Sequence, residues 1–102
     1  MKKMEDPKNV HHTLRRKDLS MNRRIGFIGI ILENHDCVEQ VNHLISESSD
    51  IILARVGLPQ RDRGVSVITL VVEATTDEVG LLTGRLGAMK GVSVKSGLAK
   101  KV

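Results

Sequence analysis

The hydrophobic residues of this chain gather in a few short runs, and the clearest run covers residues 25–32. All eight residues are apolar (Ile-Gly-Phe-Ile-Gly-Ile-Ile-Leu), with charged residues on either side. A strand with one face in water alternates apolar and polar side chains, so this run predicts a strand covered on both faces. A buried helix is the alternative, but two glycines and four isoleucines argue against it. Residues 66–72 repeat the pattern, interrupted only by Ser66 and Thr69, which predicts a second central strand.

Between these runs the pattern changes to helical spacing. Asp36 and Glu39 have the spacing of a capping box, which predicts that a helix begins there. The apolar residues that follow at helical spacing are Val38, Val41, Leu44 and Ile45. Turn-forming residues end this helix near positions 46–49. A second strand is predicted over residues 51–58, with Pro59 stopping it, and a charged hairpin connection over 59–64 leads to a third strand over 65–73.

A second helix is predicted after the third strand. Thr75 and Glu78 form another capping-box pattern. An apolar stripe follows at Val79, Leu82, Leu86 and Met89. Three glycines lie within this helix at a cost of about 1 kcal/mol each, which suggests a close approach of the helix to the sheet; they are Gly80, Gly84 and Gly87. Gly91 ends the helix, and residues 92–95 alternate as an edge strand does.

The predicted order is therefore β-α-β-β-α-β. With right-handed crossovers this order gives an α+β fold, the ferredoxin-like βαββαβ sandwich. Its four-stranded antiparallel sheet has the order 4-1-3-2, with two helices on one face. This topology places the first and third strands at the centre, which are the two strands that are apolar on both faces.

Two helices cover only one face of such a sheet, yet both central strands are apolar on both sides. The first strand has Ile25, Phe27 and Ile31 on one side and Ile28, Ile30 and Leu32 on the other. The third has Val65, Val67 and Val71 on one side and Ile68, Leu70 and Val72 on the other. A monomer would expose about six of these side chains as one patch. We therefore expect a homo-oligomer, a dimer or a tetramer, joined through the open sheet face.

Composition narrows the classes of function. Phe27 is the only aromatic residue, which disfavours binding of single-stranded nucleic acid by stacking. The lone Cys37 cannot form an intrachain disulfide and fits a reducing compartment. No apolar run approaches the roughly 20 residues of a membrane span, and no signal-peptide pattern follows the first residues. We expect a cytoplasmic protein without a membrane partner.

The positive charge is unevenly divided. Residues 1–24 contain eight Lys or Arg and three acidic residues, giving +5, whereas the remainder has eight basic and nine acidic residues, giving −1; together they give +4. We predict a flexible basic extension over residues 1–22 and a ferredoxin-fold domain over 23–102. Met21 as the natural start, with the preceding residues dispensable, is the simplest interpretation. Arg15-Arg16-Lys17 could contact phosphates, but the nearly neutral domain alone is not expected to bind DNA specifically.

Three blocks of sequence carry a resemblance to a known family. They are residues 25–34 (Ile-Gly-Phe-Ile-Gly-Ile-Ile-Leu-Glu-Asn), 55–59 (Arg-Val-Gly-Leu-Pro) and 86–95 (Leu-Gly-Ala-Met-Lys-Gly-Val-Ser-Val-Lys). From Arg24 onward the chain resembles the small family of iron-only hydrogenase system regulators, over about three quarters of its length. That family is related in fold to ACT domains and to the C-terminal domain of the nickel-responsive regulator. The resemblance implies a non-enzymatic regulatory, ligand-sensing or protein-interaction module linked to iron-only hydrogenase expression or maturation.

The chain departs from the nickel-responsive regulator in two ways. Only about 24 residues precede the first strand, too few for the ribbon-helix-helix module that binds DNA in that regulator. Its nickel ligands are largely His and Cys of sheet strands, and the strands predicted here contain neither residue. No nickel ligand therefore carries over from that regulator, and the resemblance gives no support for direct repression of a promoter.

Candidate ligand-binding residues lie at two places. ACT domains usually bind amino acids beside a glycine in the loop after the first strand; the loop here reads Glu33, Asn34, His35 and Asp36, without glycine. Arg55 lies in an otherwise apolar second strand, with Arg61 and Arg63 beyond it. Such arginines could hold an anionic ligand or an acidic partner. The alternative is that Arg55 pairs with a carboxylate across an oligomer interface.

The metal-like residues are His35, Cys37 and His43, with a weaker His11-His12 pair. On one helix Cys37 and His43 would be about 120° apart, so they do not readily close on one ion. A structural zinc site needs four ligands with paired spacings, which this chain lacks. We therefore predict no metal and no cofactor, and no catalytic residue, because no nucleophile motif or phosphate-binding loop is present. A metal sensor or carrier that uses His35, Cys37 and His43 between subunits is the alternative function.

Overall fold

The computed structural model describes residues 22–60 and 64–100. The elements in chain order are β1 (Arg24–Leu32), α2 (Val38–Glu47), the short 3-10 helix η2 (Ser49–Ile51), β2 (Ile52–Gln60), β3 (Val65–Ala74), α3 (Thr76–Gly87) and β4 (Val92–Leu98). The predictions made for residues 1–21, for Arg61 and for Arg63 lie outside the described residues. No helix in the described part of the chain is long and apolar enough to span a membrane.

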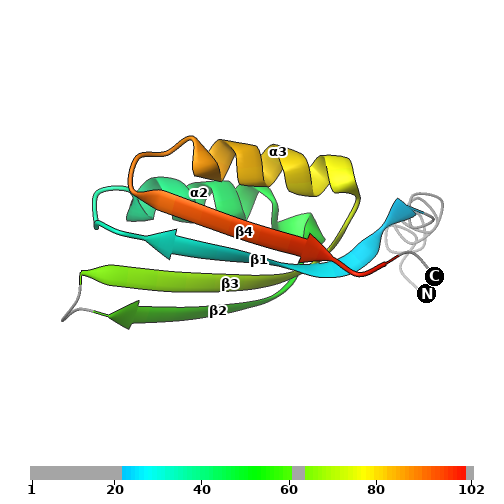
Figure 1. Ribbon diagram of the computed structural model, residues 1–102, viewed down its shortest axis with the longest axis horizontal. Helices are drawn as coiled ribbons and strands as arrows, with labels where there is room; N and C mark the ends of the chain where they lie inside the picture. Colours follow the sequence, from blue (N-terminus) through cyan, green and yellow to red (C-terminus); the bar gives the residue numbers. More distant parts are fainter. Residues whose placement is uncertain (1–21, 61–63, 101–102) are drawn as a thin grey trace, which may run out of the picture.

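The four strands form one antiparallel sheet in the order β2-β3-β1-β4, with α2 and α3 packed together on one side of it (Figure 1). This is the predicted 4-1-3-2 order read from the other edge. The ferredoxin-like βαββαβ fold class is confirmed. The two strands that are apolar on both faces, β1 and β3, are the central pair of the sheet. Each of them has a neighbouring strand on both edges.

The core lies between the sheet and the two helices. Alternate residues of β1 and β3 point into it, since successive side chains of a strand face opposite sides. From β1 these are Ile28, Ile30 and Leu32, and from β3 they are Ile68, Leu70, Val72 and Ala74, all buried. The helices contribute Val41, Leu44, Ile45, Val79, Leu82 and Leu86. The predicted division of each strand into two apolar sides thus corresponds to a covered side and an open side.

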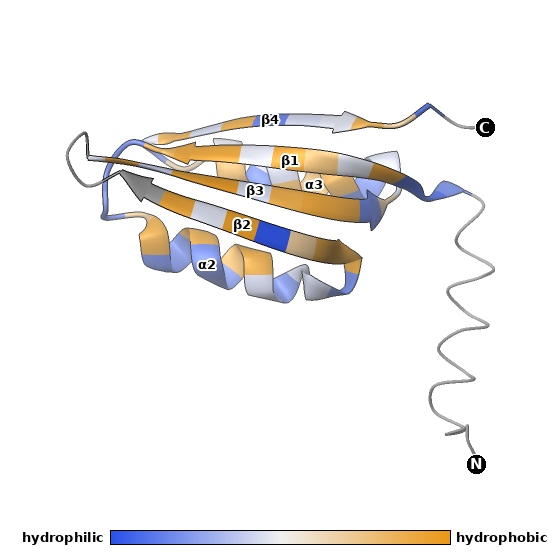
Figure 2. Ribbon diagram, turned by 90° about the horizontal axis from the view of Figure 1, so that it is seen from below, coloured by the Kyte–Doolittle hydropathy of each residue, from blue (hydrophilic) through white to orange (hydrophobic). Residues whose placement is uncertain are grey.

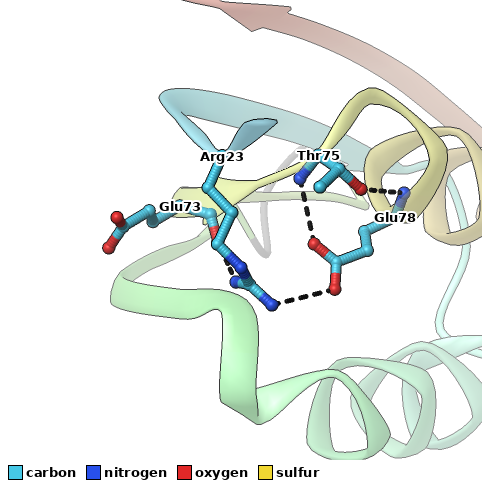
Figure 3. Close-up of polar contacts among 4 residues, drawn as sticks. All are labelled: Arg23, Glu73, Thr75 and Glu78. Carbon is cyan, nitrogen blue, oxygen red and sulfur yellow. Dashed lines mark hydrogen bonds and ion pairs between the residues drawn. The ribbon is translucent and has the colours of Figure 1, made fainter. Parts of the chain in front are cut away.

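The first turn of α3 is fixed by the predicted capping box, and Arg23 extends it (Figure 3). The Thr75 hydroxyl accepts from the Glu78 amide at 3.1 Å, and the Glu78 carboxylate accepts from the Thr75 amide at 2.9 Å. Arg23 donates to the other Glu78 oxygen at 3.1 Å and to the Glu73 carbonyl at 3.0 Å. Its side chain is only 8% exposed. Arg23 therefore links the end of β3 to the start of α3, a role that nothing in the sequence indicated.

The predicted start of the first helix was wrong. The residue before α2 is Cys37, and its side chain makes no capping hydrogen bond. Asp36 instead donates its backbone N–H to the Asn34 side-chain oxygen at 3.0 Å, which is a turn of the kind that Asn forms with the backbone two residues on. This turn outcompetes the capping box, so the helix begins at Val38.

Two other element ends also differ from prediction. Pro59 does not stop β2, since the strand runs on to Gln60 and Pro59 pairs with Ser66. Proline is tolerated here because β2 is an edge strand. Helix α3 ends at Gly87, four residues before Gly91, whose positive φ of 80° instead forms the turn into β4.

The glycines of α3 do not mark a close approach to the sheet, so this prediction was also wrong. A Cβ atom placed on Gly80, Gly84 or Gly87 would meet no atom within 4 Å. The helix contacts the sheet through Val79, Leu82 and Leu86 instead, which are buried.

Candidate functional site

The predicted ligand loop, residues 33–36, joins β1 to α2 and is tied to the turn before β4. Glu33 donates its backbone N–H to the Gly91 carbonyl at 2.8 Å. A Cβ atom on Gly91 would lie 2.5 Å from the Asn34 side-chain nitrogen, which would have to move, and the positive φ of 80° favours glycine there. Asn34 is half-buried in this contact, whereas Glu33, His35 and Asp36 are exposed. The loop is therefore held by backbone contacts and presents three polar side chains to solvent.

Arg55 lies apart from this loop. Its position on β2 is opposite Leu70 of β3, so it shares the helix-covered side of the sheet. The guanidinium donates to the Asn42 side-chain oxygen of α2 at 2.6 Å. Within the described residues, no hydrogen bond or ion pair joins Arg55 to residues 33–36. Arg55 also faces away from the open side of the sheet, so it is not placed to pair with a carboxylate across that side.

The three metal-like residues are not brought together. Cys37 is 5% exposed, and its thiol lies 3.5 Å from the Asn34 carbonyl. His43 is on the solvent side of α2, 3.1 Å from Glu47 one turn later, and His35 is exposed. Among residues 22–60 and 64–100, no group of three His, Cys, Asp or Glu side chains is arranged to hold an ion. Coordination by Cys37 between subunits would require this thiol to leave its buried position.

Most of the exposed large hydrophobic side chains of the described residues lie on the open side of the sheet, opposite the helices. The strand register arranges its side chains in rows across the strands. One row is Leu58, Val67 and Ile31, the next is Val56, Thr69 and Gly29, and the third is Ala54, Val71, Phe27 and Gly97. We call this set, together with Ile25, the open face. In Figure 2 the neighbouring strands β1, β3 and β2 are coloured mainly as hydrophobic.

The large side chains of the open face are accessible to solvent. Phe27 is 48% exposed and Val56 is 66% exposed. The others that are strongly exposed are Ile25, Ile31, Leu58 and Val71. Polar residues bound the patch on the β4 side, where Ser93 pairs with Ile31 and Lys95 pairs with Gly29. An apolar centre with a polar edge is typical of a surface that contacts another macromolecule.

Sequence reasoning found the contributions of β1 and β3 to this face but missed those of β2. Val65 and Val67 are half-buried rather than fully exposed. The exposed neighbours that complete the patch are Val56 and Leu58. The signal was present, because the second strand is apolar apart from Arg55. Using this signal requires knowing on which side of the sheet Arg55 lies. Val56 and Leu58 alternate with Arg55 and Gly57 along the strand, so they face the opposite side.

The family described as "Iron-only hydrogenase system regulator, putative" (TM1266-like) matches residues 24–96. The solved structure of the uncharacterized protein TM1266 from Thermotoga maritima is 37% identical, with a TM-score of 0.74; the match covers 76% of this chain and 99% of that one. A comparison with curated proteins gives no match.

More distant similarities concern the fold alone. The ACT domain from GTP pyrophosphokinase of Chlorobium tepidum is 22% identical, with a TM-score of 0.64, over 74% of this chain and 99% of that one. A formyltetrahydrofolate deformylase from Pseudomonas putida is 13% identical, with a TM-score of 0.54, over 74% of this chain and 29% of that one. These similarities agree with an ACT-like sandwich.

Proposed function

The chain belongs to the family of iron-only hydrogenase system regulators, and we propose that it acts in that system as a non-enzymatic module that works as a homo-oligomer. In this proposal the open face joins the subunits, and the assembled protein senses a small ligand or binds a protein of hydrogenase expression or maturation. The single observation that supports the assembly is the exposed apolar centre of the sheet.

The size of the open face makes its exposure in a monomer costly. Six of its large side chains are strongly exposed: Ile25, Phe27, Ile31, Val56, Leu58 and Val71. Removing one such side chain from water on assembly stabilises the oligomer by roughly 1.5–3 kcal/mol. Partial exposure lowers that figure, so six contribute on the order of 10 kcal/mol before the cost of association. Association costs at least about 4 kcal/mol, so this contribution favours pairing of two copies but does not by itself set its strength.

The chemistry of the open face also supports a role in binding rather than in catalysis. Its exposed large side chains are hydrocarbon, which excludes water from an interface but accepts no proton and attacks no substrate. Regulation in this proposal does not depend on specific DNA binding by the domain, whose charge beyond residue 24 is −1. Gel-shift assays on hydrogenase promoters, with and without residues 1–22, test this point. Sequence-selective binding that survives moderate salt and loss of the extension would refute it.

Two matched substitutions test the proposed function. Val71→Asp places a charge at the centre of the open face. Leu81→Asp makes the same kind of change at a residue that is 66% exposed on α3, on the helix layer. In a strain that lacks the chromosomal copy, we expect the unmodified chain and Leu81→Asp to restore iron-only hydrogenase transcript or activity. Val71→Asp should not restore them. Unchanged transcript and activity after deletion of the chromosomal copy would contradict the proposed function.

A further inference from the structure

A cleft of about 250 Å³ opens at the β2 edge of the sheet, between β2 and the first half of α2. Its walls include Val38 and Asn42 from α2 and Arg55 and Gly57 from β2. Its volume lies just below the range of about 300–1,000 Å³ that holds drug-sized ligands, so it suits a smaller molecule. The cleft borders the open face that we assign to subunit contacts, since Leu58 and Val67 also line it. Arg55 and Gly57, in contrast, lie on the helix-covered side.

The cleft exists because Gly57 has no side chain. Gly57 pairs with Ile68 of β3, and Ile68 belongs to the core on the helix side. A Cβ atom at Gly57 would point to that side and would meet no atom within 4 Å. Leu32 and Val38 complete an apolar floor beside Ile68. A short hydrocarbon group could therefore enter without displacing a protein side chain.

The polar groups of the cleft are hydrogen-bond donors. Arg55 donates through one nitrogen to the Asn42 oxygen at 2.6 Å, which positions the guanidinium at the cleft and leaves other N–H groups unused in that bond. The Asn42 side-chain NH2 provides two further donors, and the Ser66 hydroxyl lies at the cleft. Among residues 22–60 and 64–100, no carboxylate lies within 4 Å of the Arg55 guanidinium. A guanidinium with no anionic partner in the described part of the chain, held above an apolar floor, complements an anion that has a hydrocarbon end.

We propose that this cleft binds a small aliphatic carboxylate, with the carboxylate on Arg55 and Asn42 and the hydrocarbon chain over Ile68 in the space left by Gly57. The proposal deepens the proposed regulatory function, on which its biological meaning rests, by naming a class of ligand. The planar guanidinium fork matches two carboxylate oxygens, which favours a carboxylate over a neutral amide. The apolar floor favours a branched chain over acetate or inorganic phosphate. Because Arg55 is exposed to solvent, we expect an affinity in the millimolar range.

Titration of the full chain with isovalerate, followed by backbone amide NMR, tests this site. We expect saturable shifts at Val38, Gly57 and Ile68. Isovaleramide, acetate and inorganic phosphate serve as controls, each expected to bind about tenfold more weakly, because each lacks either the charge or the chain. Arg55→Gln should weaken isovalerate binding by about tenfold and leave the weak isovaleramide binding unchanged. Gly57→Val should abolish binding by filling the cleft, and we expect no fall in the midpoint of thermal unfolding, since a Cβ atom at this position meets no atom within 4 Å.

Several results would overturn the proposal. They are the absence of saturable shifts, equal binding of isovaleramide, equal binding of acetate or phosphate, and unchanged binding by Arg55→Gln. Tighter binding of a blocked glutamate dipeptide than of isovalerate would also overturn it, in favour of an acidic segment of a protein partner. Arg55→Gln changes an exposed residue and retains its hydrogen-bonding ability, so it keeps the test valid even if Gly57→Val is destabilised. If isovalerate binds but deletion of the chromosomal copy leaves hydrogenase unaffected, the site is kept and the regulatory function is refuted. If isovalerate does not bind but the deletion affects hydrogenase, the site alone is refuted.

Discussion

The two sides of the central strands have nearly the same composition but opposite environments. In β1, Ile30 is fully buried against the helices while its neighbour Ile31 is 42% exposed on the open face. In β3, Leu70 is fully buried while its neighbour Val71 is 38% exposed. The difference arises from the cover that the described chain supplies, which is one layer of two helices on one side. In the function proposed above, a second copy of this chain covers the second side.

The largest effect should follow a charge on the covered side. Leu70→Asp places a carboxylate in a core from which water is excluded, and removes a side chain whose truncation alone costs about 2–5 kcal/mol. Since a small domain has a total stability of about 5–15 kcal/mol, we expect Leu70→Asp to be unfolded or nearly so. Circular dichroism and thermal unfolding measure this. A folded Leu70→Asp with a normal midpoint would show that the two sides of the sheet have been wrongly assigned.

A smaller effect should follow changes at the end of the covered side, where Arg23 and the capping box join the sheet to α3. Thr75→Ala removes the hydroxyl that accepts from Glu78 and should cost about 0.5–2 kcal/mol. Arg23→Met keeps much of the side-chain volume but removes both hydrogen bonds, and we expect a loss of about 1–3 kcal/mol. Urea unfolding gives these values directly. Arg24→Met provides the control, because the side-chain hydrogen bond of Arg24 within residues 22–60 and 64–100 is an exposed contact of 3.4 Å with the Ala99 carbonyl.

If Arg23→Met and Arg24→Met had equal effects, the link through Arg23 would contribute nothing specific. The double change Arg23→Met with Glu78→Gln sharpens the test. If the two residues interact as described, their combined loss should be smaller than the sum of the separate losses.

The smallest effect should follow removal of residues 1–22 with Arg23 kept. These residues contribute little apolar surface and show no periodic pattern. The midpoint of thermal unfolding should therefore remain almost unchanged in a scanning calorimeter. A fall of about ten degrees would correspond to roughly 1–2 kcal/mol of docking and would refute the interpretation of this segment as a mobile extension.

The topology could be predicted from the sequence because right-handed crossovers leave few arrangements for a β-α-β-β-α-β chain. The two apolar runs at residues 25–32 and 66–72 predicted the central strands, and the Thr75–Glu78 spacing predicted the start of α3, which the structure confirms. Hydrophobic periodicity does not predict the competition between a turn and a helix cap. Asp36 has the spacing of a cap, but its backbone N–H donates to the Asn34 side-chain oxygen in a turn instead.

The candidate sites were less accessible to sequence reasoning, because they depend on which side of an edge strand faces the helices. Arg55 was identified as a candidate, but its partner Asn42 lies 13 positions away and shares no pattern with it. The same register fixes Gly57 on the helix side and Val56 on the open face. A bulge between Ile52 and Ala54 shifts the pairing of β2, so alternation counted from the start of the strand does not give these sides.

Static light scattering of the unmodified chain at micromolar concentration tests the central claim that the open face joins subunits. The account predicts a mass that is a multiple of the monomer mass, with Val71→Asp folded at the monomer mass and Leu81→Asp still at the higher mass. A well-folded monomer for the unmodified chain would contradict it.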